Sequence, residues 1–229
     1  MSDDQKSELF DPVAPEQPAA PAPEDARVVG VGPWEGEWPE GEHWDEELLR
    51  EGDRRNVLDH YRYWTMDAII ADLDTRRHTF HVAIENWQHD LNIGTVVRTA
   101  NAFLAKEVHI IGKKRWNRRG AMVTDRYQHV RHHPTVEDFV EWARAEGLAI
   151  IGIDIFPDSK QLETYDLPKD CVLVFGQEGP GLSEGIHAAA EATLSIEQYG
   201  STRSMNAATA AGIAMHAWIR RHEFGQKVN

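Results

Sequence analysis

The chain has 229 residues and a 41% hydrophobic content, enough for one well-packed α/β domain with an appendage and short for two full domains. Its one cysteine, Cys171, excludes an intramolecular disulfide and sits in an apolar run, which suits a reducing compartment. Residues 1–11 lack the basic start and apolar stretch of a secretory signal, and the longest mainly apolar run, 148–156, is too short to span a bilayer. We therefore expect a cytoplasmic protein with no membrane association.

The net charge of −14 is unevenly distributed along the chain. Residues 1–60 hold 17 Asp and Glu against 5 Lys and Arg, a net charge of −12, which leaves −2 for residues 61–229. Because the body is nearly neutral, the acidic total does not exclude binding to nucleic acid.

The N-terminal region differs in composition from the rest. Residues 1–42 are rich in Pro, Ala, Glu and Asp and are expected to form a disordered acidic tail. Three tryptophans in the tail and at its end either pin a piece of it to the folded body or lie in a loose linker: Trp34, Trp38 and Trp44. Residues 43–77 show helical spacing and are expected to form a helical extension. The remaining residues, 78–229, are expected to form the main folded domain.

That domain alternates between short β-rich runs and helical stretches. The predicted elements in chain order are strand 79–84, helix 94–103, strand 107–111, helix 136–145, strand 148–153, strand 171–175, a short helix from 182, strand 193–196 and a helix over about 204–222. Strands separated by helices predict an α/β fold with a parallel sheet covered by helices on both faces. Ligands of such sheets bind beyond the carboxyl ends of the strands, so the loops after residues 84, 175 and 196 are candidate sites.

The first of these loops, 92–100, opens a helix with Asn92 and places Arg98 two turns in. A helix N-terminus and a guanidinium suit an anion such as a phosphate. Taken alone, a plain helix cap and a solvated arginine explain the segment as well.

The second loop, 175–182, surrounds Glu178 with three glycines after a buried strand. Glycine allows a ligand to approach the backbone closely, whereas the alternative is a tight turn with Glu178 as a helix cap. The order G-x-x-G-x-G, late in the chain, disfavours a nicotinamide enzyme.

The third loop, 196–206, leads into a helix rich in Ala and Gly, and Ser204 and Asn206 are expected around the N-terminus of that helix. An ordinary buried helix with a serine cap is the alternative interpretation.

Together, in this order, the three segments resemble the motifs of the SpoU family, also called TrmH, of RNA ribose 2′-O-methyltransferases in the SPOUT superfamily. The resemblance spans about residues 79–222, but Glu197 and Gln198 stand where the family usually has Pro-Met. The matching residues are Asn92, Gly94 and Arg98 in the first motif, Gly176, Glu178 and Gly181 in the second, and Ser204, Met205 and Asn206 in the third.

The resemblance implies a C-terminal trefoil knot (the SPOUT α/β-knot), a homodimer, and S-adenosyl-L-methionine as the cofactor. It implies a catalytic set of Arg98, Asn92, Glu178, Ser204 and Asn206. It also implies cofactor contacts from Gly176, Gly181, Ile196, Ser204 and Met205.

The family allows two roles for Arg98, a base acting on the 2′-hydroxyl or a clamp that orients the substrate. A guanidinium stays protonated near neutral pH, so we prefer the phosphate clamp. Asn92, Glu178 and Asn206 would then position Arg98 and the ribose.

A basic segment follows the second predicted strand and is the expected RNA surface. Cations around one aromatic ring, Trp116, suit backbone contact plus base stacking, and His129, Arg126 and Arg131 are expected to extend the surface. A solvated loop with Trp116 tucked into the protein is the alternative. The expected RNA-binding residues are Lys113, Lys114, Arg115, Arg118 and Arg119.

The histidines at 129, 132 and 133 do not have a convincing ligand spacing with any Cys or carboxylate, and Arg131 lies between them, so no metal site is expected. Many members of the family that act on ribosomal RNA carry an extra N-terminal substrate-binding domain of α/β type. Because residues 1–77 do not resemble such a domain, transfer RNA is preferred over ribosomal RNA as the partner. Two alternatives stay open, the same reaction on ribosomal RNA and an RNA-binding member of the fold that has lost catalysis.

Overall fold

The structure is a computed structural model that describes residues 30–88 and 92–227. Most of the expected acidic tail, residues 1–29, lies outside the described residues. By their contacts the described residues form two units, which we call unit 1 (30–38 and 46–63) and unit 2 (39–45 and 64–227). The expected boundaries at residues 42 and 77 stay predictions about the organisation of the chain.

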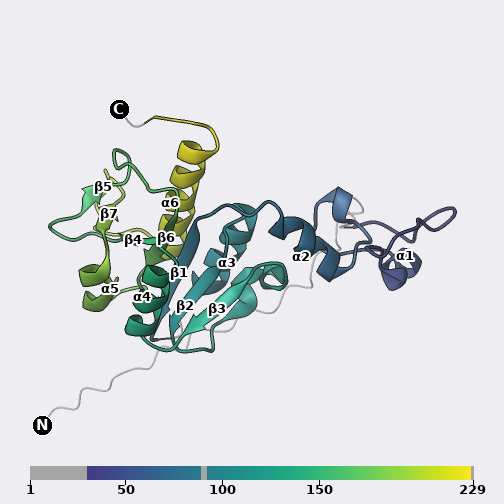
Figure 1. Cartoon of the computed structure of the whole chain (residues 1–229), viewed down its shortest axis with the longest axis horizontal. Coiled ribbons are helices and arrows are strands. Elements are labelled where there is room, and N and C mark those ends of the chain that lie inside the picture. The colour runs from purple at the N-terminus through teal and green to yellow at the C-terminus, as the bar shows by residue number, and fades with distance from the viewer. Residues whose placement is uncertain (1–29, 89–91, 228–229) are drawn as a thin grey trace, which may run out of the picture. The chain divides into compact units, whose positions relative to one another are not determined.

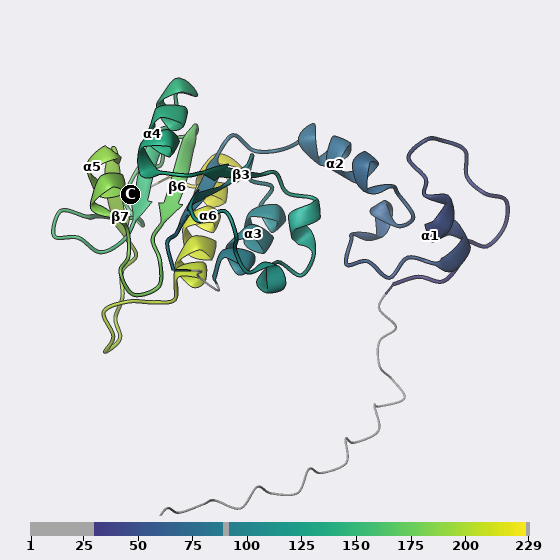
Figure 2. The same cartoon turned by 90° about the horizontal axis from the view of Figure 1, so that it is seen from below.

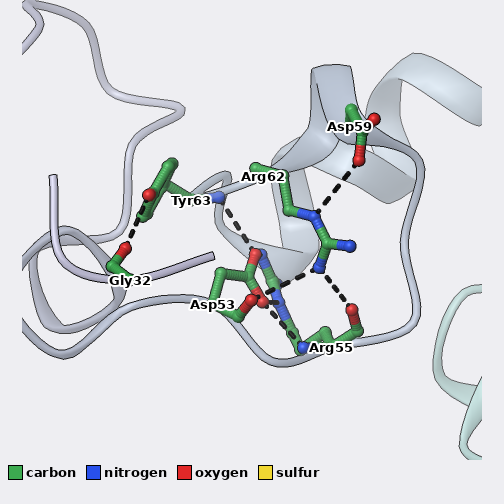
Figure 3. Close-up of polar contacts among 6 residues, drawn as sticks. All are labelled: Gly32, Asp53, Arg55, Asp59, Arg62 and Tyr63. Carbon is green, nitrogen blue, oxygen red and sulfur yellow. Dashed lines mark hydrogen bonds and ion pairs between the residues drawn. The ribbon is translucent and has the colours of Figure 1, made fainter. Parts of the chain in front are cut away.

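Unit 1 contains helix α1 (Glu46–Glu51) and the 3-10 turn η1 (Asp59–Tyr61). Its centre is the buried carboxylate of Asp53, which accepts hydrogen bonds from the Arg55 side chain and backbone and from the backbone N–H of Tyr63, as Figure 3 shows. The Tyr63 hydroxyl donates to the carbonyl of Gly32, 31 residues away in the chain. Polar contacts therefore organise a segment that has little apolar core.

The three N-terminal tryptophans pack within their own units. Trp34 meets the ring of Tyr63 edge-on at 5.4 Å, and Arg50 lies over Trp38 at 5.8 Å, both in unit 1. In unit 2, Trp44 meets Trp64 at 6.4 Å. Trp34 and Trp38 therefore contact residues of unit 1 and Trp44 contacts Trp64, whereas pinning of the tail to the main domain stays a prediction.

Unit 2 is built on a seven-stranded sheet in the order β3-β2-β1-β6-β4-β7-β5, and every pairing is parallel (Figure 1). The expected parallel sheet is confirmed. Its strands are β1 (His81–Asn86), β2 (Val108–Gly112), β3 (Val130–His133), β4 (Ala149–Ile153), β5 (Lys160–Gln161), β6 (Cys171–Phe175) and β7 (Ala192–Ser195).

Helices cover both faces of this sheet, as expected (Figure 2). Side chains of α3 and α6 join the larger core cluster on one face, where Trp218 is fully buried. Side chains of α4 and α5 join the second cluster on the other face, around Phe139. The helices of unit 2 are α2 (Met66–Asp74), α3 (Asn92–Ala102), α4 (Val136–Ala145), α5 (Glu184–Ala189) and α6 (Ala207–His222), with 3-10 turns η2 (Arg118–Ala121) and η3 (Thr124–Arg126).

The last helix begins at Ala207, three residues later than expected, and the reason is its cap. The Asn206 side chain accepts from the backbone N–H groups of Ala208 and Thr209. Asn206 is therefore the N-cap, and Ser204 lies in the preceding loop. No helix in the described ranges 30–88 and 92–227 is long and apolar enough to cross a bilayer. The trefoil knot stays a prediction.

Candidate functional site

Three loops meet at the edge of the sheet where the parallel strands end. They follow β1, β6 and β7, and their polar side chains contact one another although the first loop lies more than 80 residues from the other two in the chain. The convergence expected from the carboxyl-end rule is therefore present.

One carboxylate joins the three loops. Glu178 Oε2 accepts from Asn92 Nδ2 at 2.8 Å and from Asn206 Nδ2 at 3.3 Å, and the same Asn206 amide donates to Asn92 Oδ1 at 2.8 Å. The backbone N–H of Ala207, in the first turn of α6, also points at Glu178 Oε2, at 3.4 Å. We call Asn92, Glu178 and Asn206 the edge network. It brings together three of the five expected catalytic residues.

Arg98 and Ser204 complete the expected catalytic set without joining the edge network. Arg98 is exposed on α3, and within the described ranges it has no hydrogen bond or ion pair, which leaves its guanidinium available to a ligand. Ser204 is exposed and lines the pocket described next.

A pocket beside the edge network is lined by all five expected cofactor residues, Gly176, Gly181, Ile196, Ser204 and Met205. The pocket is open to solvent, and its empty volume, open solvent included, is about 720 Å³. A Cβ on Gly176 would overlap the backbone of Gly181 and Leu182, so only glycine permits the loop to fold back on itself there.

Sequence reasoning missed Asp154, which follows β4 and lines the same pocket. Its two carboxylate oxygens accept from the backbone N–H groups of Leu182 and Ile155, each at 2.7 Å. The signal that would have found it is its place directly after a buried strand, at the same edge as the other loops. Gln177 was also missed: it is buried, and its side-chain oxygen accepts from Trp87 N at 2.9 Å, which ties the first loop to the second.

Glu197 and Gln198, which stand where the family usually has Pro-Met, make their contacts through their side chains and through one backbone N–H. Glu197 Oε2 accepts from Gln161 Nε2 on β5 at 2.8 Å, and its backbone N–H donates to Glu163. Gln198 lines the pocket and donates to the carbonyl of Arg203, which closes the loop on itself. Gln198 therefore places a polar side chain in the wall of the pocket.

The basic segment, residues 113–119, lies against the start of α3. Asn86 Nδ2, at the end of β1, donates to the carbonyls of Lys113 and Arg115 at 2.7 and 2.8 Å. A Cβ on Gly94 would lie 2.7 Å from Ala121 N, so α3 and η2 are in backbone contact there. Because Arg98 lies one helical turn after Gly94, this contact places the basic segment beside the helix that carries Arg98.

The five expected RNA-binding cations are all exposed. Trp116 is partly buried against the core, as the alternative interpretation expects, and Arg118 lies over its ring at 5.5 Å. The cations around it are nevertheless exposed, so they remain accessible to RNA. Two of the residues expected to extend this surface, His129 and Arg131, line a surface pocket together with Lys114, Trp116 and Arg118, and the third, Arg126, is exposed. Arg131 also covers Trp142 at 5.3 Å, and His129 pairs with Asp74 at 2.8 Å.

The histidines considered for a metal do not converge. His129 bonds to Asp74, His132 to the carbonyl of Gly112, and His133 to His109. A different set does come together, since donor atoms of His81, Glu107 and His109 all lie within 4.8 Å of one another. The set was not apparent from the sequence because His81 lies on β1, far along the chain from Glu107 and His109 at the start of β2.

Comparison with known proteins identifies the family of the chain. The model of the SpoU rRNA Methylase family matches residues 79–216. A tRNA (guanosine(18)-2′-O)-methyltransferase of Borreliella burgdorferi is 25% identical over 155 residues, which are 66% of this chain and 70% of that protein. An uncharacterised tRNA/rRNA methyltransferase of Mycolicibacterium vanbaalenii is 29% identical over 163 residues, and the chain spans about half its length, 51%.

Solved structures share the fold. The TrmH/SpoU tRNA modifying enzyme of A. aeolicus superposes with a TM-score of 0.61 at 24% identity, over 70% of this chain and 84% of that one. The SpoU methyltransferase AviRb of Streptomyces viridochromogenes, in complex with AdoMet, superposes with a TM-score of 0.57 at 26% identity, over 68% of this chain and 62% of that one.

Proposed function

Because the chain belongs to the SpoU rRNA methylase family, we propose that it transfers a methyl group from S-adenosyl-L-methionine to a ribose 2′-hydroxyl of RNA, with transfer RNA as the substrate. The observation that carries this proposal is the edge network beside the glycine-lined pocket. A methyl acceptor positioned by the network lies next to a donor bound in the pocket.

The residues of the pocket suit S-adenosylmethionine. Its wall combines apolar side chains such as Leu194 and Met205 with exposed backbone at the glycines, which suits an adenine ring. The carboxylates of Asp154 and Glu178 supply negative charge for the sulfonium and ammonium groups of the cofactor. Gly176, Gly181, Ile196, Ser204 and Met205 are the proposed cofactor contacts.

S-adenosylmethionine supplies a methyl group already carried on a good leaving group, so the protein mainly has to align the acceptor oxygen. Arg98 binds a phosphate next to the target nucleotide and fixes its ribose. Asn92 and Asn206, held by Glu178, hydrogen-bond to the ribose and orient its 2′-hydroxyl, and Ser204 contributes a hydroxyl to the same site. The basic segment binds the neighbouring RNA backbone.

Transfer RNA is the proposed substrate because the relatives from Borreliella burgdorferi and A. aeolicus are named for action on tRNA. The name of the family model itself favours ribosomal RNA as the second candidate. Tritiated methyl transfer to total cellular RNA, followed by mapping of ribose-methylated positions, separates the two. No incorporation into either RNA by the folded, cofactor-bound protein would leave only the inactive RNA-binding member of the fold.

Arg98 provides the sharpest test of the mechanism. Arg98→Ala is expected to abolish methyl transfer while cofactor binding, measured by calorimetry, stays within about threefold, because the guanidinium acts on RNA. Arg144→Ala, which removes an exposed arginine from α4, is the matched control and is expected to retain full activity. Full activity of Arg98→Ala would remove this residue from the mechanism.

The finer expectations belong to the same proposal: a cytoplasmic homodimer, a trefoil knot at the C-terminus, and a chain divided into tail (1–42), helical extension (43–77) and methyltransferase domain (78–229). Ile213 on α6 is 38% exposed, which supports the use of that helix in a dimer. Light scattering of the purified chain, with Ile213→Glu as the comparison, measures the oligomeric state.

A further inference from the structure

A polar cluster with a buried centre at His109 lies on the face of the sheet that α4 covers, away from the three loops. His81 is the first residue of β1, Glu107 directly precedes β2, and His109 is the second residue of β2. Alternate residues of a strand share a face, so His81 projects with Ala83 and His109 with Ile111 toward the α4 side. The parallel register sets Val82 beside Val108, which brings His81 level with Glu107.

The donor atoms of these three side chains converge. His81 Nδ1 lies 3.0 Å from His109 Nε2, and Glu107 Oε2 lies 3.8 Å from the same nitrogen. Two ligands bound at about 2.0–2.1 Å to a tetrahedral ion lie about 3.3 Å apart. These two separations bracket that value, and the third pair of donor atoms, those of His81 and Glu107, lies within 4.8 Å.

Both imidazoles are in the form that coordinates metals. Burial, followed by the charges of Lys106 and Arg131, lowers the pKa of His81 to about 4. Burial also holds the pKa of His109 well below its usual range. Neutral imidazoles near pH 7 offer a nitrogen lone pair without first losing a proton.

The surroundings orient these ligands. The other nitrogen of His109, Nδ1, lies 2.9 Å from His133 Nε2, which as a hydrogen-bond acceptor leaves the Nε2 lone pair of His109 directed at the cluster. Arg131 Nε donates to Glu107 Oε1 at 3.2 Å, so the other carboxylate oxygen remains on the histidine side. Metal-binding histidines commonly donate their second N–H in this way, and metal-binding carboxylates are commonly hydrogen-bonded in turn.

We propose that His81, Glu107 and His109 bind a divalent transition-metal ion such as Zn²⁺, with water as the fourth ligand. Two histidines and one carboxylate form a recognised ligand set for such ions. Lys106 and Arg131 oppose a cation here and Glu107 offsets one of these charges, so we expect weaker binding than in a closed all-protein site. The site lies at the strand edge opposite the pocket, where an ion would stabilise the β1–β2 pairing and take no part in methyl transfer.

The test uses the full chain without a polyhistidine tag, stripped with a chelator. Calorimetric titration with Zn²⁺ is expected to give one equivalent bound, and Co²⁺ is expected to give the visible absorption of a tetrahedral site. His81→Gln and Glu107→Gln are each expected to weaken binding by at least about 10-fold, as is His133→Gln through its hydrogen bond to His109. His216→Gln, a change at an exposed histidine of α6, is the matched control and should bind as the parent does.

Far-UV circular dichroism establishes that each variant is folded. Zn²⁺ is expected to raise the melting temperature of the parent and of His216→Gln, and to leave that of His81→Gln unchanged. The proposal would be overturned if the folded parent bound no stoichiometric Zn²⁺, or if His81→Gln and Glu107→Gln bound Zn²⁺ as tightly as the parent. The cluster would then be a chain of hydrogen-bonded imidazoles. Methyl transfer that survives chelation would leave this proposal and the proposed function independent of each other.

Discussion

Two carboxylate-centred networks in this chain are built in opposite ways. In the edge network the carboxylate of Glu178 is exposed and is carried by a loop, with partners on two other loops. In unit 1 the carboxylate of Asp53 is fully buried, and four N–H donors of Arg55 and Tyr63 point at its two oxygens.

The difference separates what each network can do. A buried carboxylate requires partners to offset its desolvation, and those of Asp53 come from the chain itself, so this network serves folding. An exposed network on loops contributes little to stability and keeps hydrogen-bonding capacity for a ligand, so the edge network serves binding. Removal of a carboxylate is therefore expected to lower activity in the edge network and stability in unit 1.

Between the two networks, the largest expected effect is on activity, from Glu178→Ala. Removing the shared acceptor frees Asn92 and Asn206 to move, and a displacement of about 1 Å costs about 100-fold in rate. The free energy of unfolding should change by less than about 1 kcal/mol because the side chain is exposed. Steady-state methyl transfer and urea unfolding measure the two quantities, with Glu141→Gln on the exposed face of α4 as the control. A folded Glu178→Ala with parental kcat would break the comparison on the functional side.

Asp53→Ala is expected to act on stability. It leaves the half-buried Arg55 guanidinium without its bidentate partner, at a cost of about 2 kcal/mol after allowance for the partial exposure of Arg55. Amides of unit 1 such as Val31, which donates to the Asp53 carbonyl, should then exchange with solvent about 30-fold faster.

Asp59→Ala is the matched control, because Asp59 is a fully exposed partner of Arg62 in the same unit. Its amide exchange should equal that of the parent. Unchanged exchange in Asp53→Ala would show that burial of a carboxylate does not distinguish the two networks.

The sequence predicted the elements that local signals define, and it missed those that depend on contacts between residues far apart in the chain. Helix α4 was predicted at its observed bounds because local signals define it, with Thr135 capping its start. The strand 171–175 was equally clear, since five consecutive buried residues form an apolar run. Strand β3 was missed because Arg131, His132 and His133 are polar and the strand exists by pairing with β2 at the sheet edge.

The site divides in the same way. The convergence of the three loops followed from the rule for parallel sheets, and the motifs identified Asn92, Glu178 and Asn206. Their hydrogen-bond partners, and the contribution of Asp154, depend on the paths of loops that no local pattern encodes. The contact of Gly32 with Tyr63 across 31 residues escaped for the same reason, because it has no periodicity.

Like the edge network, the basic segment is exposed, and we expect it to serve binding and not stability. Changing Lys113, Arg115 and Arg118 to Gln should lower the slope of log affinity against log salt by about 0.7 for each phosphate of single-stranded RNA that is no longer neutralised, or about 2 in total. Stability should not change, because these side chains are exposed. Filter binding to RNA at several salt concentrations measures the slope. Changing Arg144 and Lys169, exposed cations elsewhere in unit 2, should leave it as it is; a slope that the triple change does not alter would place the RNA on another surface.

The smallest expected effect is a dependence of unit 1 on pH. Burial alone raises the pKa of Asp53, but the hydrogen bonds and charge of Arg55 and the N–H of Tyr63 outweigh it and hold this pKa below its ordinary value of 3.8. A pKa that is lower in the folded state stabilises the fold above the unfolded pKa, and this stability is lost as pH falls through the folded pKa. Unit 1 should therefore be insensitive between pH 7 and about 5 and should weaken only below about 4. The amide proton of Tyr63, followed by NMR, reports this transition directly because it bonds to the titrating group, and Asp53→Asn should remove it. A midpoint above the ordinary value would mean that burial outweighs Arg55, and that the second network is held together less tightly than its geometry indicates.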